Sequence, residues 1–410
     1  MSERKADCVI IGCGAAGMMA AVTAARRGKR VVVLEHEKIC GKKLRITGKG
    51  RCNVCNNCDI KTFLQNVPVN PKFLYSALSR FSPADAMTFF EELGVPLKTE
   101  RGNRVFPVSD RAHDVADALV REMRAQNVRV LHENAQEVLT EDGAVRGVRS
   151  SGGVIDCASA LIAAGGVSYP LTGSTGDGLR MARALGHTVT PLRPSLVPLT
   201  SDDPDCAAMQ GFALKNVRLT LLDRTRRPIY SELGEMLFTH FGVSGPLVLS
   251  ASALMRDASA GPYSLEIDLK PGLDEKKLDA RILRDFEKYR NRDFSNALND
   301  LAGRSMIPVL IRRSGIPPET KVNAITREQR RALVELFKAF SVPISGTRPI
   351  AEAIVTSGGV SVTEVDPRTM CSKLVRGLYF AGEVLDVDAY TGGFNLQIAW
   401  STGALAGAHL

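Results

Sequence analysis

The chain has 410 residues, of which 44% are hydrophobic and 24% charged, so it is long enough for two or three globular domains. Lys and Arg exceed Asp and Glu by 53 − 44 = 9, but no basic arm, zinc-finger spacing or aromatic RNA motif accompanies this scattered excess. We therefore expect a small-molecule substrate, anionic ligands and no specific nucleic acid. Glycines interrupt the apolar run 8–25, which argues against a signal or membrane segment, and nine cysteines without a signal favour reduced thiols in the cytoplasm.

The first 35 residues predict a strand, a tight turn, a helix and a second strand. An apolar strand at 7–12 leads into the Ala-rich helix 15–27, and a β-branched strand follows at 30–34. The turn matches G-x-G-x-x-G, whose glycines permit a tight turn, a close approach of pyrophosphate and close packing of helix on strand. Phosphates would sit at the helix N-terminus, and the acidic residue after the second strand would accept hydrogen bonds from a ribose. The dinucleotide contacts predicted here are Gly12, Gly14, Ala15, Ala16, Gly17 and Glu35.

The segment that follows mixes helices and strands. Apolar residues at helical spacing predict helices at 72–93 and 113–126. A hairpin is expected around the turn Asp142-Gly143. The predicted strands are 128–131, 135–140, 145–148 and 161–164, the last of which ends in Gly165-Gly166 and suits another close backbone approach to a cofactor.

A change in residue composition past Pro191 predicts a domain boundary. Prolines break the chain, strands follow at 217–222, 229–230 and 263–269, and the segment between Pro271 and Phe340 is strongly helical and charged. Strands return from residue 354. We predict an α/β fold in which residues 1–190 and 350–410 form a Rossmann-like domain, residues 191–271 and about 341–349 a β-rich substrate domain, and residues 272–340 a helical insert.

The C-terminal segment favours FAD over NAD. In many flavoproteins the chain returns to the nucleotide domain with a strand that ends in Gly-Asp or Gly-Glu, and a helix then begins facing the flavin. Here a strand at 379–381 ends in Gly382-Glu383, and Thr391-Gly392-Gly393-Phe394-Asn395 opens a helix that runs to about Ala408. Backbone donors at that helix start would stabilise negative charge on a reduced flavin ring. An ordinary helix cap containing two glycines is the alternative.

Four segments carry a resemblance that covers nearly the whole chain. They are KKLRITGKGRCN at 42–53, VTSGGV at 355–360, GEVLDVD at 382–388 and GFNLQ at 393–397. With them the chain closely resembles the bacterial FAD-binding family called aminoacetone-oxidase-like, which includes 3-dehydro-bile-acid Δ4,6-reductase. The resemblance implies an FAD domain built from both ends of the chain, a discontinuous β-barrel-like substrate domain and a small helical subdomain within it.

The resemblance also implies further cofactor contacts. Arg51 would offset phosphate charge, Asn53 would hydrogen-bond the ribityl chain or the ring edge, and the backbone of Val138 would meet the adenine. The further cofactor contacts expected, in these segments and at Val138 and the end of the strand 161–164, are Lys43, Thr47, Gly48, Gly50, Arg51, Cys52, Asn53, Val138, Ala164, Gly165, Gly382, Glu383, Asp386, Gly393, Phe394, Asn395 and Leu396.

Three cysteines in the loop after residue 51 depart from the family pattern. Cys52-x-x-Cys55-x-x-Cys58, with Cys40 upstream, has spacing like part of an iron–sulfur ligand set. Small inert residues, a redox-active thiol pair and a cluster are all open interpretations, in that order. Histidines 36, 113, 187 and 240 have no metal-ligand spacing, so no metal site is predicted.

Flavin chemistry leads to three functional hypotheses. The first is a reductase that passes hydride from NADH or NADPH through FAD to an activated C=C bond of an enone, with Tyr390 as the proton donor or substrate anchor. A 3-oxo-Δ4 steroid or bile-acid intermediate as substrate rests on the resemblance alone. The second is an oxidase of a small amine, and the third is an RNA-associated flavoprotein, which the positive charge would suit.

Overall fold

The computed structural model describes residues 4–256 and 261–410, which divide into two compact units. Unit 1 consists of residues up to Ser195 together with Pro349–Leu410, and unit 2 is the stretch Leu196–Arg348. Each unit has a hydrophobic core of its own. Unit 1 is therefore discontinuous in sequence, whereas unit 2 is made from one uninterrupted stretch.

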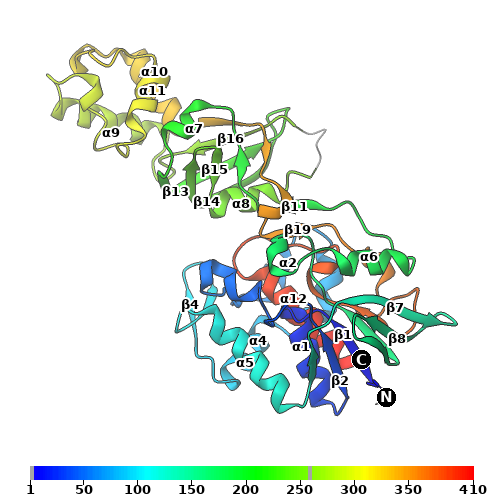
Figure 1. Ribbon diagram of the computed structural model, residues 1–410. Helices are drawn as coiled ribbons and strands as arrows, with labels where there is room; N and C mark the ends of the chain where they lie inside the picture. The colour runs from blue at the N-terminus through cyan, green and yellow to red at the C-terminus, as the bar shows by residue number, and fades with distance from the viewer. Residues whose placement is uncertain (1–3, 257–260) are drawn as a thin grey trace. The chain divides into compact units, whose positions relative to one another are not determined.

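A parallel sheet lies at the centre of unit 1 (Figure 1). Its five strands pair in the order β20-β10-β1-β2-β6, and every neighbouring pair is parallel. Strands such as β1 and β2 are runs of apolar residues that are buried on both faces, as expected for a sheet covered on both sides. The strands are β1 (Cys8–Ile11), β2 (Val31–Leu34), β6 (Arg129–Leu131), β10 (Ser159–Ile162) and β20 (Leu378–Phe380).

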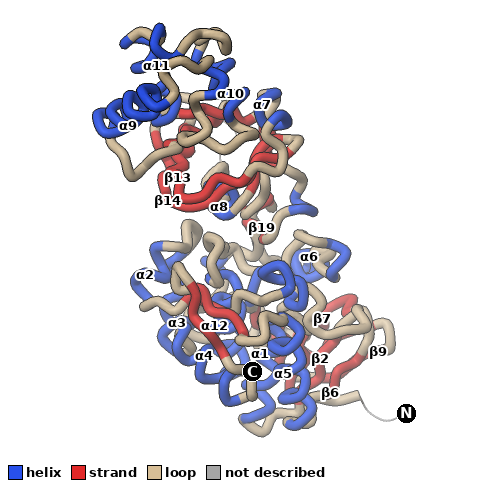
Figure 2. Tube along the Cα trace, turned by 90° about the vertical axis from the view of Figure 1, so that its left-hand side faces the viewer, coloured by secondary structure: helices blue, strands red, loops and turns tan. Residues whose placement is uncertain are grey.

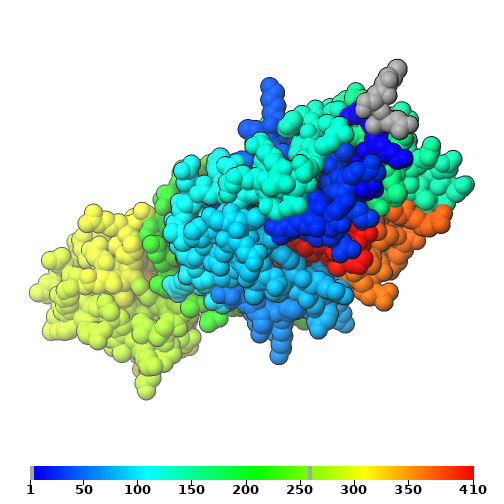
Figure 3. Space-filling model, turned by 90° about the horizontal axis from the view of Figure 1, so that it is seen from below, coloured from blue at the N-terminus to red at the C-terminus, as the bar shows by residue number. Residues whose placement is uncertain are grey.

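Helices from both ends of the chain pack together in unit 1. Helix α1 (Ala15–Arg26) contacts both α5 (Ala112–Ala125) and α12 (Phe394–His409), and the three lie side by side in Figure 2. Nearly all of α12 is buried, because it is apolar all round rather than on one stripe. In the space-filling view, its red atoms emerge next to the blue atoms of the N-terminal segment (Figure 3). The predicted βαβ unit and the returning parallel strand are thus confirmed.

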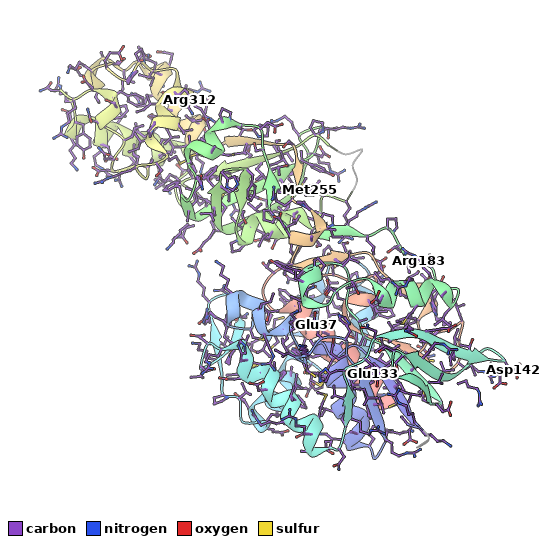
Figure 4. The ribbon with its side chains drawn as sticks, viewed as in Figure 1. Glu37, Glu133, Asp142, Arg183, Met255 and Arg312 are labelled. Carbon is purple, nitrogen blue, oxygen red and sulfur yellow. The ribbon has the colours of Figure 1, made fainter. Side chains whose placement is uncertain are left out.

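An antiparallel sheet packs against β10. Its strands β7 (Ala135–Glu141), β8 (Ala144–Ser150) and β9 (Gly153–Asp156) follow one another in the chain. Asp142 and Gly143 both have positive φ, the geometry of the two-residue turn that joins β7 to β8, and Asp142 lies at the tip of this hairpin in Figure 4. The hairpin predicted around these two residues is confirmed.

The helical structure predicted at 72–93 is confirmed, but the structure divides it into separate helices. A 3-10 turn η2 (Pro71–Leu74) and α3 (Tyr75–Arg80) end at Phe81, whose φ of −147° is not helical. A new helix, α4 (Pro83–Glu92), then begins behind Ser82, which forms a capping box with Asp85. Proline at the first position of α4 also favours a new start there. The remaining elements of this region are α2 (Ile60–Gln65), β3 (Cys55–Asn56), β4 (Leu97–Glu100), β5 (Arg104–Pro107) and α6 (Asp177–Ala184).

Unit 2 contains a seven-stranded antiparallel sheet in the order β17-β16-β13-β14-β15-β12-β18. The first and last strands of this order are separated in the chain by Ser345 alone, so the sheet must curl round toward closure. The predicted fold class, a Rossmann-like domain with a β-barrel-like insert and helices, is confirmed. The strands are β12 (Leu199–Thr200), β13 (Ala213–Leu222), β14 (Pro228–Thr239), β15 (Gly242–Ser244), β16 (Tyr263–Asp268), β17 (Phe340–Ile344) and β18 (Gly346–Thr347), and the helices are α7 (Pro204–Ala208), α8 (Pro246–Ser252), α9 (Glu275–Lys288), α10 (Ile307–Ser314) and α11 (Arg327–Lys338).

The two passages of the chain out of and back into unit 1 are paired with each other. Strand β11 (Arg193–Ser195) runs antiparallel to β19 (Val355–Ser357). The fully buried carboxylate of Asp388 accepts hydrogen bonds from the hydroxyls of Ser195, at 2.7 Å, and Ser357, at 3.0 Å. One acidic side chain therefore fastens both strands. None of the helices in the described part of the chain has the length and apolar character needed to cross a membrane.

Candidate functional site

The glycine-rich turn leaves a helix N-terminus without a side-chain cap. Gly14 is the N-cap residue of α1 and offers no capping atom, so the first N–H groups of the helix keep their capacity to bind an anion. A Cβ atom at Gly17 would lie 1.9 Å from the carbonyl oxygen of Gly12, so only glycine permits this approach. The turn therefore has the geometry expected of a pyrophosphate site.

Glu35 is fixed at the end of β2 by two backbone donors. Its carboxylate accepts hydrogen bonds from the N–H of Cys13, at 2.8 Å, and the N–H of Glu37, at 2.9 Å. A carboxylate can accept about four hydrogen bonds, so Glu35 retains capacity for ribose hydroxyls. The same contacts join the end of β2 to the glycine-rich turn.

The loop at 44–53 has a strained backbone. Lys49 and Cys52 adopt left-handed conformations without being glycine, at φ 58° and 59°. The N–H of Cys52 donates to the carbonyl of Thr47 at 3.0 Å, which closes the loop on itself. Strain of about 1–3 kcal/mol per residue persists only where surrounding contacts hold it, and such strain clusters at ligand sites. The predicted contacts Gly48 and Gly50 belong to this loop.

Arg51 is already paired in the structure. Its guanidinium donates to Glu100 and Asp110, each at 2.6 Å, and lies 4.1 Å from the centre of the Phe106 ring. The hydrogen bond from Arg51 lowers the pKa of Glu100. The positive charge of Arg51 is thus balanced locally, and its role beside a phosphate stays a prediction.

Lys43 and Glu383 join four segments of unit 1. The ammonium group of Lys43 donates to the Glu383 carboxylate at 2.8 Å and to the Ser168 hydroxyl at 2.8 Å. Glu383 also accepts from Ser168, at 2.9 Å, and from the N–H of Thr356, at 2.8 Å. Burial raises the pKa of Glu383, but Lys43 and these donors outweigh burial and the net pKa is lowered, so the carboxylate is ionised.

Asn53 lies beside the N-terminus of α12 and has an oxygen without a hydrogen-bond partner. Its Oδ1 is buried and has no hydrogen-bond partner. A Cβ atom at Gly393, the N-cap of α12, would lie 2.9 Å from this oxygen and 2.3 Å from the carbonyl of Cys55. An orphaned acceptor beside uncapped helical N–H groups is the arrangement expected where a ligand supplies the missing partners. These residues fit the predicted FAD.

The other residues predicted near the flavin ring make contacts within the protein. Asn395 holds residue Ala389, accepting from its N–H at 2.9 Å and donating to its carbonyl at 2.8 Å. Phe394 is buried and packs edge-to-face on Phe63 at 5.2 Å. Tyr390 is partly exposed, and its N–H donates to the carbonyl of Asn66 at 3.0 Å. Partly buried Leu396 packs against the core of unit 1.

Two close approaches bring predicted segments together, and a third contact lies within the strained loop. A Cβ atom at Gly12 would lie 2.6 Å from the carbonyl of Ala163, next to Ala164 and Gly165. A Cβ atom at Gly382 would lie 2.8 Å from that of Ala16. Thr47 bonds the carbonyl of Leu44, at 2.7 Å, within the strained loop. The glycine turn, the end of β10 and the end of β20 therefore form one neighbourhood.

Two predicted contacts lie elsewhere in unit 1. Val138 is buried in β7. Asp386 is half-buried, and its carbonyl accepts from the Asn70 side chain at 2.7 Å. The predicted cofactor contacts of all these residues stay predictions.

Sequence reasoning missed Ser168 and Thr356 as individual residues. Both are buried, and both contact Glu383. Ser168 carries no sequence signal beyond its place shortly after Gly165-Gly166. Thr356 lies within the VTSGGV segment that carried the family resemblance, so that segment was the available signal.

The three closely spaced cysteines are protonated at neutral pH. Burial raises the pKa of Cys52 and of Cys55 to about 12, and that of Cys58 to about 11. Residues 4–256 and 261–410 contain no group of three or more His, Cys, Asp or Glu side chains arranged to hold a metal ion. These properties favour inert packing over thiolate chemistry at this trio.

A surface groove in unit 2 has no comparable chemistry. It is lined mainly by apolar residues of α10 and the Gly315–Pro318 loop. Its charged member, Arg312, lies on α10 (Figure 4) and pairs with Asp205. The candidate site therefore lies in unit 1, which contains the glycine-rich turn, Glu35, the loop at 44–53, the Lys43–Glu383 pair and the start of α12.

Comparison with known proteins identifies the family. The model of the HI0933-like protein Rossmann domain matches residues 6–409. The chain is 31% identical to a 3-dehydro-bile acid Δ(4,6)-reductase of Clostridium scindens, over 97% of each chain. It is also 31% identical to a ribosomal RNA dihydrouridine synthase of Escherichia coli, over 97% of this chain and 96% of that protein.

A solved structure supports the same fold. The open conformation of a flavocytochrome c3 fumarate reductase matches with a TM-score of 0.55 and 16% identity, over 100% of this chain and 78% of that chain. At this identity the match bears on fold alone. Together with the bile-acid reductase relative, the family match confirms the resemblance predicted from the four segments. The chain belongs to the HI0933-like Rossmann family and is an FAD-dependent oxidoreductase.

Proposed function

We propose that this oxidoreductase passes hydride from NADH or NADPH through FAD to a C=C bond conjugated to a carbonyl group. The observation that carries the proposal is the type of reaction shared by the names of two of its relatives. One is named for reducing a Δ(4,6) system in a 3-dehydro bile acid, and the other for making dihydrouridine. Dihydrouridine is uridine whose carbonyl-conjugated C5=C6 bond is saturated. The substrates differ in size and charge, but the bond reduced is of one chemical type.

Bound FAD would accept hydride from the nicotinamide and donate it to the substrate. The residues of unit 1 would bind and orient it. The start of α1 and Glu35 would hold the pyrophosphate and the adenosine ribose, and the unpaired Oδ1 of Asn53 would accept a hydrogen bond from the ring system or ribityl chain. The uncapped N-terminus of α12 would favour negative charge at the flavin.

Tyr390 is proposed to hold the proton that completes the reduction. Hydride addition to a conjugated C=C leaves negative charge at the neighbouring carbon, which must then be protonated. Tyr390 precedes the Gly392-Gly393 turn and is partly exposed. We expect Tyr390→Phe to slow substrate reduction about 10²-fold, the usual scale of general acid catalysis, and to leave reduction by NADH unchanged. Tyr75→Phe, at a side chain that is 61% exposed, is the control.

Stopped-flow spectroscopy under anaerobic conditions separates the two steps. If the substrate reoxidises the flavin of Tyr390→Phe as fast as that of the wild type and of the control Tyr75→Phe, Tyr390 is not the proton donor. If the wild type is not reduced by either nicotinamide, the proposed hydride source is wrong.

Two substrate classes follow from the proposal. A 3-oxo-Δ4 or Δ4,6 steroid is the small-molecule candidate, supported by the relative from Clostridium scindens. Uracil in RNA is the second candidate, and it is favoured by the dihydrouridine synthase relative together with the net charge of +9, which suits a polyanion.

One set of assays decides between them. The anaerobically reduced protein is mixed with a steroid enone, with a ribosomal RNA transcript, or with buffer, and the return of the oxidised flavin absorbance is followed. Reoxidation by the steroid alone, or by the RNA alone, assigns the substrate class. If neither substrate reoxidises the flavin, and small amines reduce it, the protein is an amine oxidase and the reductase hypothesis is wrong.

A further inference from the structure

The loop 386–392, which leads into α12, contains no helix or strand. Side-chain amides from other segments of unit 1 bind its backbone. Asn70 donates to the carbonyl of Asp386 at 2.7 Å, and Asn56 donates to the carbonyl of Gly392 at 3.0 Å. These two hydrogen bonds hold the two ends of the loop.

Asn395, in the first turn of α12, holds the middle of the same loop. Its Oδ1 accepts from the N–H of Ala389 at 2.9 Å, and its Nδ2 donates to the carbonyl of Ala389 at 2.8 Å and to that of Tyr390 at 3.3 Å. Ala389 is fully buried, and buried backbone groups need hydrogen-bond partners. Asn395 supplies a partner to both polar backbone groups of this residue.

The peptide unit between Ala389 and Tyr390 is held at both ends. Its carbonyl accepts from Asn395, and its N–H donates to the carbonyl of Asn66 at 3.0 Å. Because a peptide unit is planar, hydrogen bonds on opposite edges fix its orientation. The direction in which the Tyr390 side chain leaves the backbone is restricted with it.

We propose that Asn395 is a positioning residue that holds Tyr390 where it protonates the substrate. The inference deepens the proposed role of Tyr390 and rests on it. Both hydrogens of Asn395 Nδ2 and one of the two lone pairs of Oδ1 are engaged by the loop, so the amide has little capacity left for FAD.

Proton transfer depends on this kind of placement. A proton donor must lie within about 2.6–3.2 Å of its partner, and a displacement of about 1 Å can slow a reaction about 10²-fold. A loop without helix or strand keeps such precision only where other groups bind its backbone.

The test is anaerobic reoxidation of the reduced holoprotein, with the steroid enone and the ribosomal RNA transcript as probes. At saturating probe, we expect Asn395→Ala to slow reoxidation about tenfold or more, while the half-saturating concentration stays at the wild-type value. In the Tyr390→Phe background the same change should slow reoxidation less than about twofold, because a missing hydroxyl cannot be misplaced. A residue that only stabilises the fold would slow reoxidation by the same factor in both backgrounds.

A second measurement needs no substrate. Hydrogen exchange of the holoprotein, followed by mass spectrometry, should be faster in peptides covering residues 386–392 of Asn395→Ala than in the wild type. Asn395→Asp keeps the acceptor for Ala389 but faces its carbonyl with a second oxygen, so it should behave in the same way, and it replaces Asn395→Ala if that variant folds poorly. Asn57→Ala, at an exposed asparagine outside this loop, should match the wild type in both measurements.

The outcomes separate this inference from the proposed function. If the flavin of Tyr390→Phe is reoxidised at the wild-type rate, Tyr390 is not the donor and the role of Asn395 falls with it. If Tyr390→Phe is slow but the Asn395 variants are not, or if the two effects multiply, only the role of Asn395 is overturned. If neither probe reoxidises the wild type, the proposed reduction is wrong, and the exchange measurement alone decides whether Asn395 holds Tyr390.

Discussion

The buried Oδ1 of Asn53 has no hydrogen-bond partner, and this destabilises the protein when its cofactor is absent. Asn53 is one of three side chains in residues 4–256 and 261–410 with a buried polar atom that lacks a partner, together with Thr239 and Gln397. Leaving a buried acceptor unsatisfied costs about 1–3 kcal/mol. Because this acceptor lies at the N-cap of α12, binding of FAD is the event expected to relieve the cost.

Asn53→Ala should therefore affect the free and bound forms in opposite directions. We expect the dissociation constant of FAD to rise about tenfold, about 1.4 kcal/mol, while the melting temperature of the apoprotein stays level or rises. Fluorescence titration and calorimetry measure the two quantities. Asn57→Ala, at an exposed position just after β3, should change neither. Unaltered FAD affinity in Asn53→Ala would remove this residue from the cofactor site.

The ion pair of Lys43 and Glu383 predicts an acid dependence of stability. The pKa of Glu383 in the folded protein lies below its usual value of 4.5. Its stabilising contribution is therefore complete above about pH 4.5 and is lost as the pH falls through the lower folded value. Glu383→Gln should lower the free energy of unfolding of the apoprotein at pH 7 and flatten its decline in acid.

Urea unfolding of the apoprotein across a pH series measures this effect. The control is Glu137→Gln, which removes an exposed carboxylate paired with Arg149 at 3.2 Å and should keep the wild-type slope. If Glu383→Gln also keeps that slope, the carboxylate is not held ionised by Lys43.

At the scale of elements, the sequence predicts local structure well where one pattern dominates. The βαβ unit of residues 8–34 follows from apolar runs and glycine spacing, and its strands pair as expected. The break at Phe81 was missed because apolar residues continue at helical spacing across it, although the capping residues Ser82 and Asp85 signal a new helix. Strand β14 was predicted only at 229–230, because its middle is exposed and polar.

The candidate site was predictable only in its linear motifs. The glycines at 12, 14 and 17 and the segment 47–53 can be recognised from the sequence alone. The bonds from Ser168 and Thr356 to Glu383 join residues that are distant in the chain, and no local pattern encodes them. For the same reason, the pairing of Arg51 with Glu100 and Asp110 was not foreseen.

The contact between α1 and α12 sets how the first helix is held. A Cβ atom at Gly403 would lie 2.5 Å from the carbonyl of Ala16, in the first turn of α1. We expect Gly403→Val to lower the free energy of unfolding by about 1–3 kcal/mol, since overpacking must shift backbone. It should also weaken FAD binding, because the N-terminus of α1 is the part of the chain predicted to bind the pyrophosphate.

Thermal unfolding and FAD titration test this prediction. Gly272→Val is the control, because a Cβ atom there would meet nothing within 4 Å and the residue has no positive φ. If the two variants are equally stable, the close approach of α12 to α1 does not limit the size of residue 403, and the prediction is wrong.

For the whole molecule, two separate cores predict two unfolding events. Unit 1 and unit 2 each enclose a hydrophobic cluster, and the predicted FAD contacts all lie in unit 1. FAD at about 100 times its dissociation constant should stabilise unit 1 by about 2.7 kcal/mol and leave unit 2 unchanged. Scanning calorimetry should then show one transition that moves upward with FAD and one that does not. A single transition that shifts as a whole would contradict independent unfolding of the units.

The discontinuity of unit 1 has a consequence for the order of events during synthesis. Unit 2 can begin to fold as soon as residue 348 has left the ribosome, because it is one uninterrupted stretch. The glycine-rich turn and α1, although made first, lack their neighbours β20 and α12 until the last residues emerge. We therefore expect newly made chains to acquire flavin only after translation has reached α12, and a nascent chain arrested before residue 378 should carry none.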